Sequence, residues 1–196
     1  MAATAVRYLR TAGAPTTTRP YDALPRPELR AVADDERPPV DPCEFRRVLG
    51  QFATGVTVVT AYDAGTPAGF ACQSFSSLSL DPPLVAFMVA RTSTTWPRIA
   101  RAGVFCVNIL GADQGELCMG FAVRGADKFA GVAYAPAPVT GSPLLAGVPA
   151  WVDCTIHAVH TGGDHLIVVG RVEALGATDG DGPLLFHRGA FGRLAP

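Results

Sequence analysis

The chain has 196 residues, of which 48% are hydrophobic and 17% are charged, and its formal net charge is −1. This length fits one domain with a substantial core. A nearly neutral chain lacks the basic footprint that nucleic-acid binding requires, and the sequence has no run of about 18 apolar residues that would span a membrane. Because few charges are available to cover the surface, we expect apolar surface to be buried in a homo-oligomer.

The cysteines and the N-terminal segment indicate the compartment and the domain boundary. The five cysteines form no C-x-x-C pair, which is typical of reduced core thiols, and residues 1–15 lack the continuous apolar stretch of a secretory signal. We therefore expect a cytoplasmic protein. Residues 1–41 are rich in Ala, Pro, Arg and Thr without a sustained period, which is typical of a flexible arm. The folded domain is expected to span residues 42–196.

The first expected element of this domain is a helix that begins at Asp41-Pro42 and ends at Gly55. An aspartate in the N-cap position followed by proline is a common helix start. The expected apolar face of the helix consists of Phe45, Val48, Leu49 and Phe52.

Strands dominate the rest of the expected domain, because β-branched and aromatic runs recur between turn residues. The expected strands are Val56–Tyr62, Gly69–Leu78, Leu84–Ala90, Val104–Leu110, 151–160 and 165–175. The last two flank a turn and predict a hairpin. The expected helices are Thr92–Ala102 and a second one after Asp113 that turns Leu117, Phe121 and Met119 inward. Without strand–helix alternation, this order favours an antiparallel barrel over a doubly wound sheet.

The stretch GFACQSFSSLSLDPPL (69–84) carries more hydroxyls than a buried strand normally tolerates. A desolvated hydroxyl without a partner costs about 1–3 kcal/mol. If the strand leads into a loop, Phe75 and Leu78 reach the core, while the hydroxyls and backbone amides of residues 74–77 line a rim. Such a rim suits a planar ligand with polar edges. A serine-rich edge loop that ends at the Pro-Pro turn is the alternative.

The segment Arg91-Thr92-Ser93-Thr94-Thr95 places hydroxyls and a guanidinium at the start of an expected helix. Free N–H groups, the helix dipole and a positive charge together favour a phosphate. An ordinary N-cap is the alternative, since it needs only one of these hydroxyls. The sequence contains no Walker-type loop and no G-x-G-x-x-G, so the phosphate would not belong to a P-loop or Rossmann nucleotide.

His165 follows the tight turn of the expected hairpin. Its place after the turn predicts a side chain beside the barrel mouth, with Asp164 setting its orientation; an ordinary surface histidine is the alternative. His157 and His160 fall on opposite faces of a strand, which argues against a metal pair. The sequence also lacks the G-x-S-x-G motif of serine hydrolases.

Six motifs in this order resemble the flavin reductase family, the reductase components of two-component flavin monooxygenases. They are FATGVTVVT (52–60), SFSSLSLDPPLV (74–85), VFCVNIL (104–110), FAVRGADKFAG (121–131), GDH (163–165) and PLLFHRGAF (183–191). The resemblance runs from about Phe45 to Phe191 and leaves residues 1–41 outside.

This resemblance implies a mainly β fold, a six-stranded antiparallel split β-barrel with a few flanking helices, assembled as a homodimer. It implies that the protein binds FAD or FMN, reduces it with NADH or NADPH, and supplies diffusible reduced flavin to a partner monooxygenase. The hydride passes between the two cofactors, so no catalytic side chain is expected.

The resemblance also assigns binding residues. The isoalloxazine ring and ribityl chain are expected to contact Ala71, Cys72, Gln73, Ser74, Phe75, Ser77 and Leu78. The phosphate-binding segment matches Thr92, Ser93 and Thr94, with Arg91 or Arg98 as helpers. Arg124 and Phe129 match a stretch near the distal part of the flavin. His165 and Phe191 match the nicotinamide side of the pocket.

The sequence departs from the family pattern in two places, and several alternative functions remain open. Ala71-Cys72-Gln73 stands where relatives often carry Thr, Ala or Asn, and hydroxyls replace a lysine of some relatives in the phosphate segment, so FMN and FAD both stay open. The alternatives are a non-catalytic flavin- or haem-binding split barrel, a flavin oxidase acting on a phosphorylated pyridine, and a ligand-binding β-barrel without redox activity. The sparse charge of this chain disfavours the oxidase, which needs basic residues for its substrate's phosphate.

Overall fold

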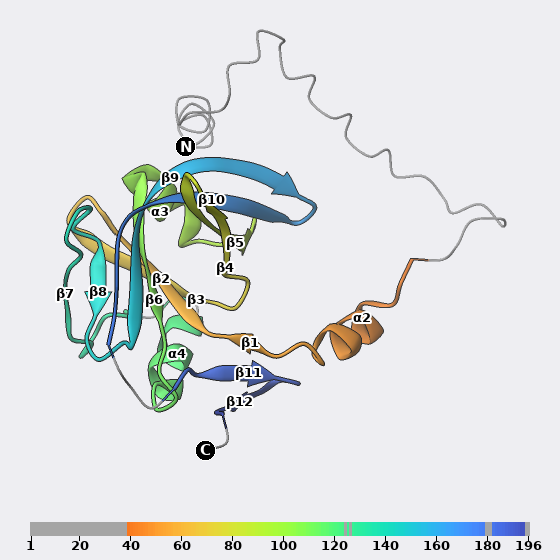
Figure 1. Ribbon diagram of the computed structural model, residues 1–196. Helices are drawn as coiled ribbons and strands as arrows, with labels where there is room; N and C mark the ends of the chain where they lie inside the picture. The colour runs from red at the N-terminus through yellow and green to blue at the C-terminus, as the bar shows by residue number, and fades with distance from the viewer. Residues whose placement is uncertain (1–38, 124, 126, 179–181, 195–196) are drawn as a thin grey trace, which may run out of the picture.

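The computed structural model describes residues 39–123, 125, 127–178 and 182–194. Most of the arm predicted for residues 1–41 therefore lies outside the described residues. The elements of the described part follow one another in the order α2 (Pro42–Leu49), β1 (Thr54–Gly55), β2 (Thr57–Asp63), β3 (Thr66–Cys72), β4 (Ser76–Leu80), β5 (Pro83–Ala90), α3 (Trp96–Ala102), β6 (Val104–Ile109), α4 (Gly115–Ala122), β7 (Tyr134–Pro136), β8 (Pro143–Leu145), β9 (Ala150–Gly162), β10 (His165–Ala177), β11 (Leu185–His187) and β12 (Ala190–Gly192) (Figure 1).

The main sheet has seven strands in the order β3-β2-β6-β9-β10-β5-β4, and all of its pairings are antiparallel. The fold is therefore mainly β, as predicted. It has one strand more than the six expected, because the segment predicted as one strand over Gly69–Leu78 forms two. Residues 73–75 separate β3 from β4, and the two strands lie at opposite edges of the sheet.

The predicted hairpin of β9 and β10 is confirmed, and its two strands of 13 residues are the longest described. Its tip pairs His165 with Gly162 on one side and with Ala90 of β5 on the other. Further along β10, Gly170 lies against the ring of Phe105; an added Cβ there would meet the ring at 2.4 Å. The close contact allows the sheet to fold tightly over its core.

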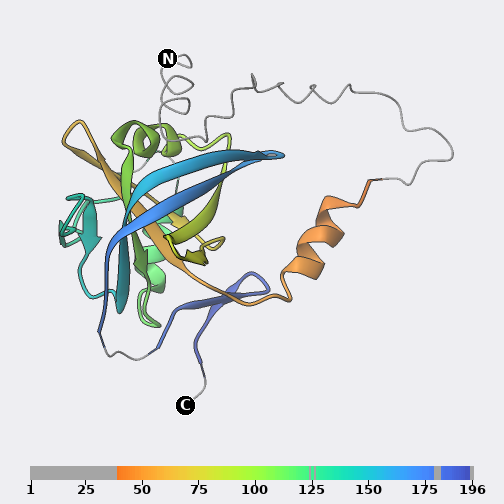
Figure 2. The ribbon, with the colours of Figure 1, turned by 45° about the horizontal axis from the view of Figure 1, so that its top comes forward.

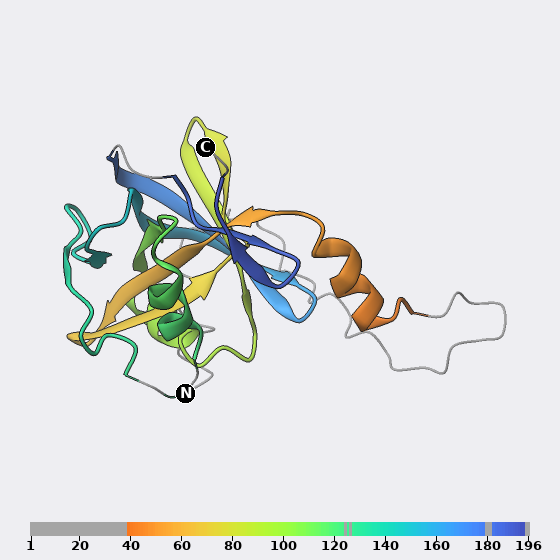
Figure 3. The same ribbon diagram turned by 90° about the horizontal axis from the view of Figure 1, so that it is seen from below.

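The core has two parts on either side of the coiled sheet. One gathers around Phe87, Phe105 and Trp96, where α3 covers the strands, and the other around Phe121 and Leu145. Figure 3 shows α4, which supplies Phe121, lying across the strands on its side of the molecule.

The helices differ from the prediction at their ends. The first, α2, ends at Leu49 and not at Gly55, because the Gly50 amide caps the last turn and Gly55 pairs with Leu185. The second, α3, begins at Trp96 and not at Thr92.

The third helix, α4, buries Phe121 but leaves Met119 exposed, contrary to the inward position expected for Met119. Met119 lies two residues from both Leu117 and Phe121, and a separation of two residues places side chains on opposite helix faces.

The helix α2 stands apart from the body of the protein, joined to it through β1 (Figure 2). Its start is as predicted: Asp41 accepts a hydrogen bond from the Cys43 amide at 3.1 Å, and Pro42 follows. None of its residues is buried, and Phe52, just beyond it, is 77% exposed. The apolar face predicted from the sequence therefore has no partner within the described part of this chain.

A short hairpin of β7 and β8 lies in a connection where the sequence predicted no strand. The buried Asn108 of β6 holds it: its Oδ1 accepts the Leu145 amide at 2.8 Å, and its Nδ2 donates to the Val58 carbonyl at 3.1 Å. Within the described residues, no helix has the length and apolar character needed to cross a membrane.

Candidate functional site

A cavity of about 920 Å³ lies where β3, the end of β5, α3, α4 and the tip of the β9–β10 hairpin meet. This volume is near the upper end of the range for small-molecule sites, about 300–1,000 Å³. Its wall contains both polar side chains and phenylalanine rings. The cavity is thus large enough to hold more than one ring system.

The structure brings many of the predicted binding residues together in this wall, although they come from five separate segments. Those that line the cavity are Ala71, Cys72, Gln73, Ser74, Ser93, Thr94, Arg98, Phe129, His165 and Phe191. Arg124 lies outside the described residues.

Four further predicted residues are not in the wall. Phe75 packs against the core around Phe87. Ser77 and Leu78 belong to the exposed strand β4, and Leu78 is 55% exposed, contrary to the core position expected for it. Thr92 is exposed ahead of α3. Their contacts with a flavin remain a prediction.

Ser74 explains part of the unusual hydroxyl content of residues 69–84. Its Oγ accepts the Met88 amide at 2.8 Å and donates to the Met88 carbonyl at 2.9 Å, so the side chain replaces a strand residue in pairing with β5. The backbone amide of Gln73 has no acceptor in the part of the chain that the structure describes, whereas the Ser74 amide faces the Cys72 sulfur. The hydroxyl thus holds the loop in place, and the Gln73 amide remains available at the cavity wall.

Cys72 supplies a protonated thiol to the wall. Its Sγ lies 3.3 Å from the Ser74 Oγ, and burial raises the pKa of the thiol. The side chain therefore packs as a small, uncharged group and does not act as a thiolate nucleophile.

The start of α3 brings Ser93 and Thr94 to the cavity. The Ser93 Oγ accepts the Trp96 amide at 3.1 Å, whereas the N-cap residue of α3 is Thr95 and makes no side-chain capping bond. Because the bond from Trp96 uses an oxygen lone pair, the Ser93 hydroxyl hydrogen is still available to a ligand.

His165 is oriented by its neighbour, as predicted. Its Nδ1 lies 2.7 Å from the Asp164 Oδ1, and this hydrogen bond lowers the pKa of the carboxyl group. The Asp164 carbonyl also accepts the Arg91 amide at 3.0 Å. The hairpin tip is thereby tied to the end of β5, which fixes His165 at the cavity.

Comparison with known proteins agrees with this arrangement. The model of the flavin reductase like domain matches residues 49–195. A flavin-dependent monooxygenase reductase subunit from Rhodococcus jostii is 50% identical over 157 residues, which cover 80% of this chain and 80% of that protein. A flavin reductase from Pseudomonas putida is 48% identical, over 85% of this chain and 98% of that protein.

The chain belongs to the flavin reductase family.

Solved structures of the family share the fold of this flavin reductase. Nitrilotriacetate monooxygenase component B from Mycobacterium thermoresistibile aligns with a TM-score of 0.76 and 49% identity, over 79% of this chain and 87% of that one. An NADH:FAD oxidoreductase from Streptomyces globisporus, in complex with NAD and FAD fragments, has a TM-score of 0.76 and 37% identity, over 82% of this chain and 98% of that one. These matches establish the split-barrel fold that the sequence predicted.

Two aromatic groups form apolar parts of the reductase's cavity wall. Phe186 and Phe191 of the β11–β12 hairpin meet edge to face, with ring centroids 5.7 Å apart. Phe121 and Phe129 meet in the same way at 5.0 Å. Phe186 was not predicted, although it lies in the same motif as Phe191.

Lys128 is a wall residue to which the sequence analysis gave no role. Its Nζ donates to the Phe121 carbonyl at 2.9 Å and to the Gly69 carbonyl at 3.2 Å, and burial lowers the pKa of its ammonium group. It joins the end of α4 to β3 where the two approach so closely that a Cβ on Gly69 would meet Phe121 at 2.8 Å. The motif FAVRGADKFAG contains this lysine, but the neighbouring residues in the sequence do not reveal which carbonyl groups it binds.

Proposed function

We propose that this cavity binds FMN or FAD together with NADH or NADPH, that the flavin is reduced there by hydride transfer, and that reduced flavin then passes to a separate monooxygenase. The observation that carries the proposal is the loop of residues 73–75. Gln73 and Ser74 of this loop line a cavity with room for two ring systems, and the Gln73 amide donates to no residue that the structure describes. A free amide donor in such a wall suits the carbonyl and nitrogen acceptors of an isoalloxazine edge.

The polar wall residues would bind and orient the flavin. The amide of Gln73 donates to the ring edge, and the position of the loop depends on the hydrogen bonds between Ser74 and Met88. The hydroxyls of Ser93 and Thr94 and the guanidinium of Arg98 lie in a separate part of the wall and serve the phosphate end. Cys72 provides a neutral contact.

The residues of the hairpin tip and the C-terminal hairpin would hold the dinucleotide. His165 is fixed by Asp164, and Phe191 offers a ring face. When bound, the flavin accepts the hydride directly from the nicotinamide. The wall therefore needs to supply stacking, orientation and hydrogen-bond donors, and no side chain must act as an acid or base in this step.

Steady-state kinetics test this function. We expect NADH or NADPH oxidation, followed in the nicotinamide absorbance band, to require added FMN or FAD and to saturate with each. We also expect the reductase to support a flavin-dependent monooxygenase from which a dialysis membrane separates it. A protein that binds flavin without oxidising either dinucleotide would contradict the proposal.

The exposed face of α2 supports the homodimer. Phe45, Val48 and Leu49 are each about half exposed in a chain with few charges, and a second copy would cover them. We expect light scattering to give the mass of a dimer for the wild type and of a monomer for Val48→Asp. Arg46→Ala, which replaces a charged residue of the same helix, should leave the dimer intact. A monomeric wild type would contradict this assembly.

A further inference from the structure

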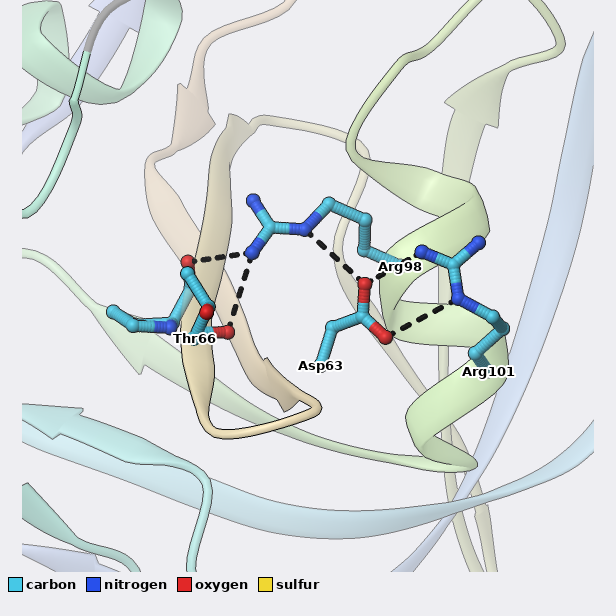
Figure 4. A network of polar contacts seen from close by, with 5 residues as sticks. Asp63, Thr66, Arg98 and Arg101 are labelled. Carbon is cyan, nitrogen blue, oxygen red and sulfur yellow. Dashed lines mark hydrogen bonds and ion pairs between the residues drawn. The ribbon is translucent and has the colours of Figure 1, made fainter.

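An ionic cluster joins α3 to the β2–β3 hairpin at one end of the cavity (Figure 4). Arg101 holds Asp63 with two hydrogen bonds, Nε to Oδ1 at 3.2 Å and Nη2 to Oδ2 at 2.5 Å. Arg98, one helical turn earlier, reaches the same carboxylate through Nε at 3.4 Å. The carboxylate thus lies between two guanidinium groups that would otherwise repel each other.

The three side chains differ in their exposure and in their distance from the cavity. Arg101 is 48% exposed and Asp63 is 19% exposed, and neither belongs to the cavity wall. Arg98 does line the cavity, and its side chain is 33% exposed. The cluster therefore runs from the surface to the wall, and its inner end is Arg98.

Hydrogen bonds hold the guanidinium of Arg98 in place, but one of its nitrogens has no described acceptor. Its Nη2 donates to the carbonyls of Thr66 at 3.2 Å and Pro67 at 3.1 Å, both of which belong to wall residues. Its Nη1 donates to no residue that the structure describes, and Figure 4 shows this nitrogen without a dashed line. A rigid guanidinium with one free edge is well suited to an oxyanion.

The charges of the cluster do not cancel. One carboxylate faces two guanidinium groups, and the shorter, two-point contact belongs to Arg101. The pKa of Asp63 is lowered, first by its hydrogen bond with Arg101, so the carboxylate is ionised at neutral pH. Because the Asp63 carboxylate lies closer to Arg101, it offsets the charge of Arg101 more than that of Arg98. Arg98 therefore keeps positive charge at the cavity.

We infer that Asp63 and Arg101 are positioning residues, which fix Arg98 and leave its charge free for the phosphate group of the bound flavin. This inference rests on the proposed function, since it assigns one group of the flavin to one end of the cavity. Asp63 and Arg101 do not touch the ligand themselves. They act by setting the direction and the residual charge of Arg98.

Comparison of FMN with riboflavin, which lacks the phosphate, tests the inference. Dissociation constants are measured by flavin fluorescence without dinucleotide. Arg98→Ala should weaken FMN binding at least about tenfold, the scale of a hydrogen bond to a charged group, and should change riboflavin binding less than about twofold. Equal losses for both ligands would overturn the assignment of the phosphate to Arg98.

Asp63→Asn separates positioning from simple charge. The change makes the cluster more positive, so attraction alone predicts tighter FMN binding. The introduced amide nitrogen is a donor and cannot accept from Arg98 or from the fork of Arg101, so positioning predicts FMN binding weaker by about threefold to tenfold. Unchanged or tighter FMN binding would overturn the inference. Riboflavin binding that stays within about twofold shows that the variant is folded.

Two more variants complete the design. Glu173→Gln removes an exposed carboxylate of β10, which accepts from Thr155 at 2.8 Å and lies outside the cavity wall, so it should leave both ligands unaffected. Arg101→Gln leaves Asp63 to neutralise Arg98 and should weaken FMN binding by about threefold without affecting riboflavin. If Arg101→Gln has no effect on FMN, Arg101 has no part in setting the charge.

The KM for NADH, measured in the same variants, identifies the source of the phosphate. We expect it to stay unchanged. A rise in this KM with unaltered FMN binding would assign Arg98 to the dinucleotide's pyrophosphate and overturn the inference. A wild type that binds FMN better than riboflavin but does not oxidise NADH would contradict the proposed function alone.

Discussion

Ser74→Ala tests whether the loop of residues 73–75, the proposed flavin contact, is held by a single side chain. The substitution removes both hydrogen bonds between Ser74 Oγ and the backbone of Met88, at 2.8 and 2.9 Å. A hydrogen bond contributes about 0.5–1.5 kcal/mol net, and water replaces part of it here because Met88 is exposed. We expect the free energy of unfolding to fall by about 1–2 kcal/mol, which lowers the Tm by roughly 2–8 °C.

The same variant should bind FMN about threefold to tenfold more weakly, because the loop of residues 73–75 loses its fixed position at the cavity. Chemical denaturation at constant protein concentration and flavin fluorescence measure the two effects. Ser76→Ala is the matched control: its hydroxyl donates to the Ser77 carbonyl at 3.0 Å in an exposed strand, and its removal should cost less than about 0.5 kcal/mol. If Ser74→Ala behaves like Ser76→Ala in both assays, the loop does not depend on this contact.

Three further predictions concern the dinucleotide, the core and the ionic cluster. His165→Ala should raise the KM for the pyridine nucleotide severalfold with little change in kcat, and unchanged steady-state kinetics would remove its role. Gly170→Ala should lower the free energy of unfolding by about 1–3 kcal/mol in chemical denaturation, since the Cβ would meet Phe105 at 2.4 Å; an unchanged midpoint would show that the ring moves aside easily. The pKa of Asp63 is lowered in the folded state, so its contribution to stability is complete above the ordinary value of 3.8 and is lost as the pH falls through the folded-state value. The difference in stability between wild type and Asp63→Asn should therefore shrink in acid. A difference independent of pH would contradict this prediction.

The sequence predicted those features that depend on neighbouring residues. The start of α2 at Asp41-Pro42 and the hairpin of β9 and β10 follow from capping and turn preferences within a few residues. The resemblance to the family then gathered distant wall residues such as Gln73, Ser93 and His165 into one predicted site.

Features that depend on contacts across the fold could not be predicted in this way. The break between β3 and β4 arises because the Ser74 side chain replaces a backbone group in pairing with Met88. The hairpin of β7 and β8 depends on the buried Asn108, which lies 37 residues before its partner Leu145 in β8. The partners of Lys128 likewise became visible only when α4 and β3 were placed together.

The apolar face of α2 shows the same limit at the level of assembly. Its periodicity predicted a helix with one apolar side, and the helix is present, but its side chains are exposed in the single chain. Hydrophobic spacing predicts that a helix face will be buried, but it does not identify the molecule that covers the face.

Rapid anaerobic mixing of the reductase with flavin and NADH tests the central claim most directly. We expect the flavin absorbance to bleach in a protein-dependent phase, with one flavin reduced for each NADH consumed, and we expect that phase to saturate as either ligand is raised. A bleaching rate equal to that of flavin and NADH without protein would contradict the claim that the two meet in this cavity.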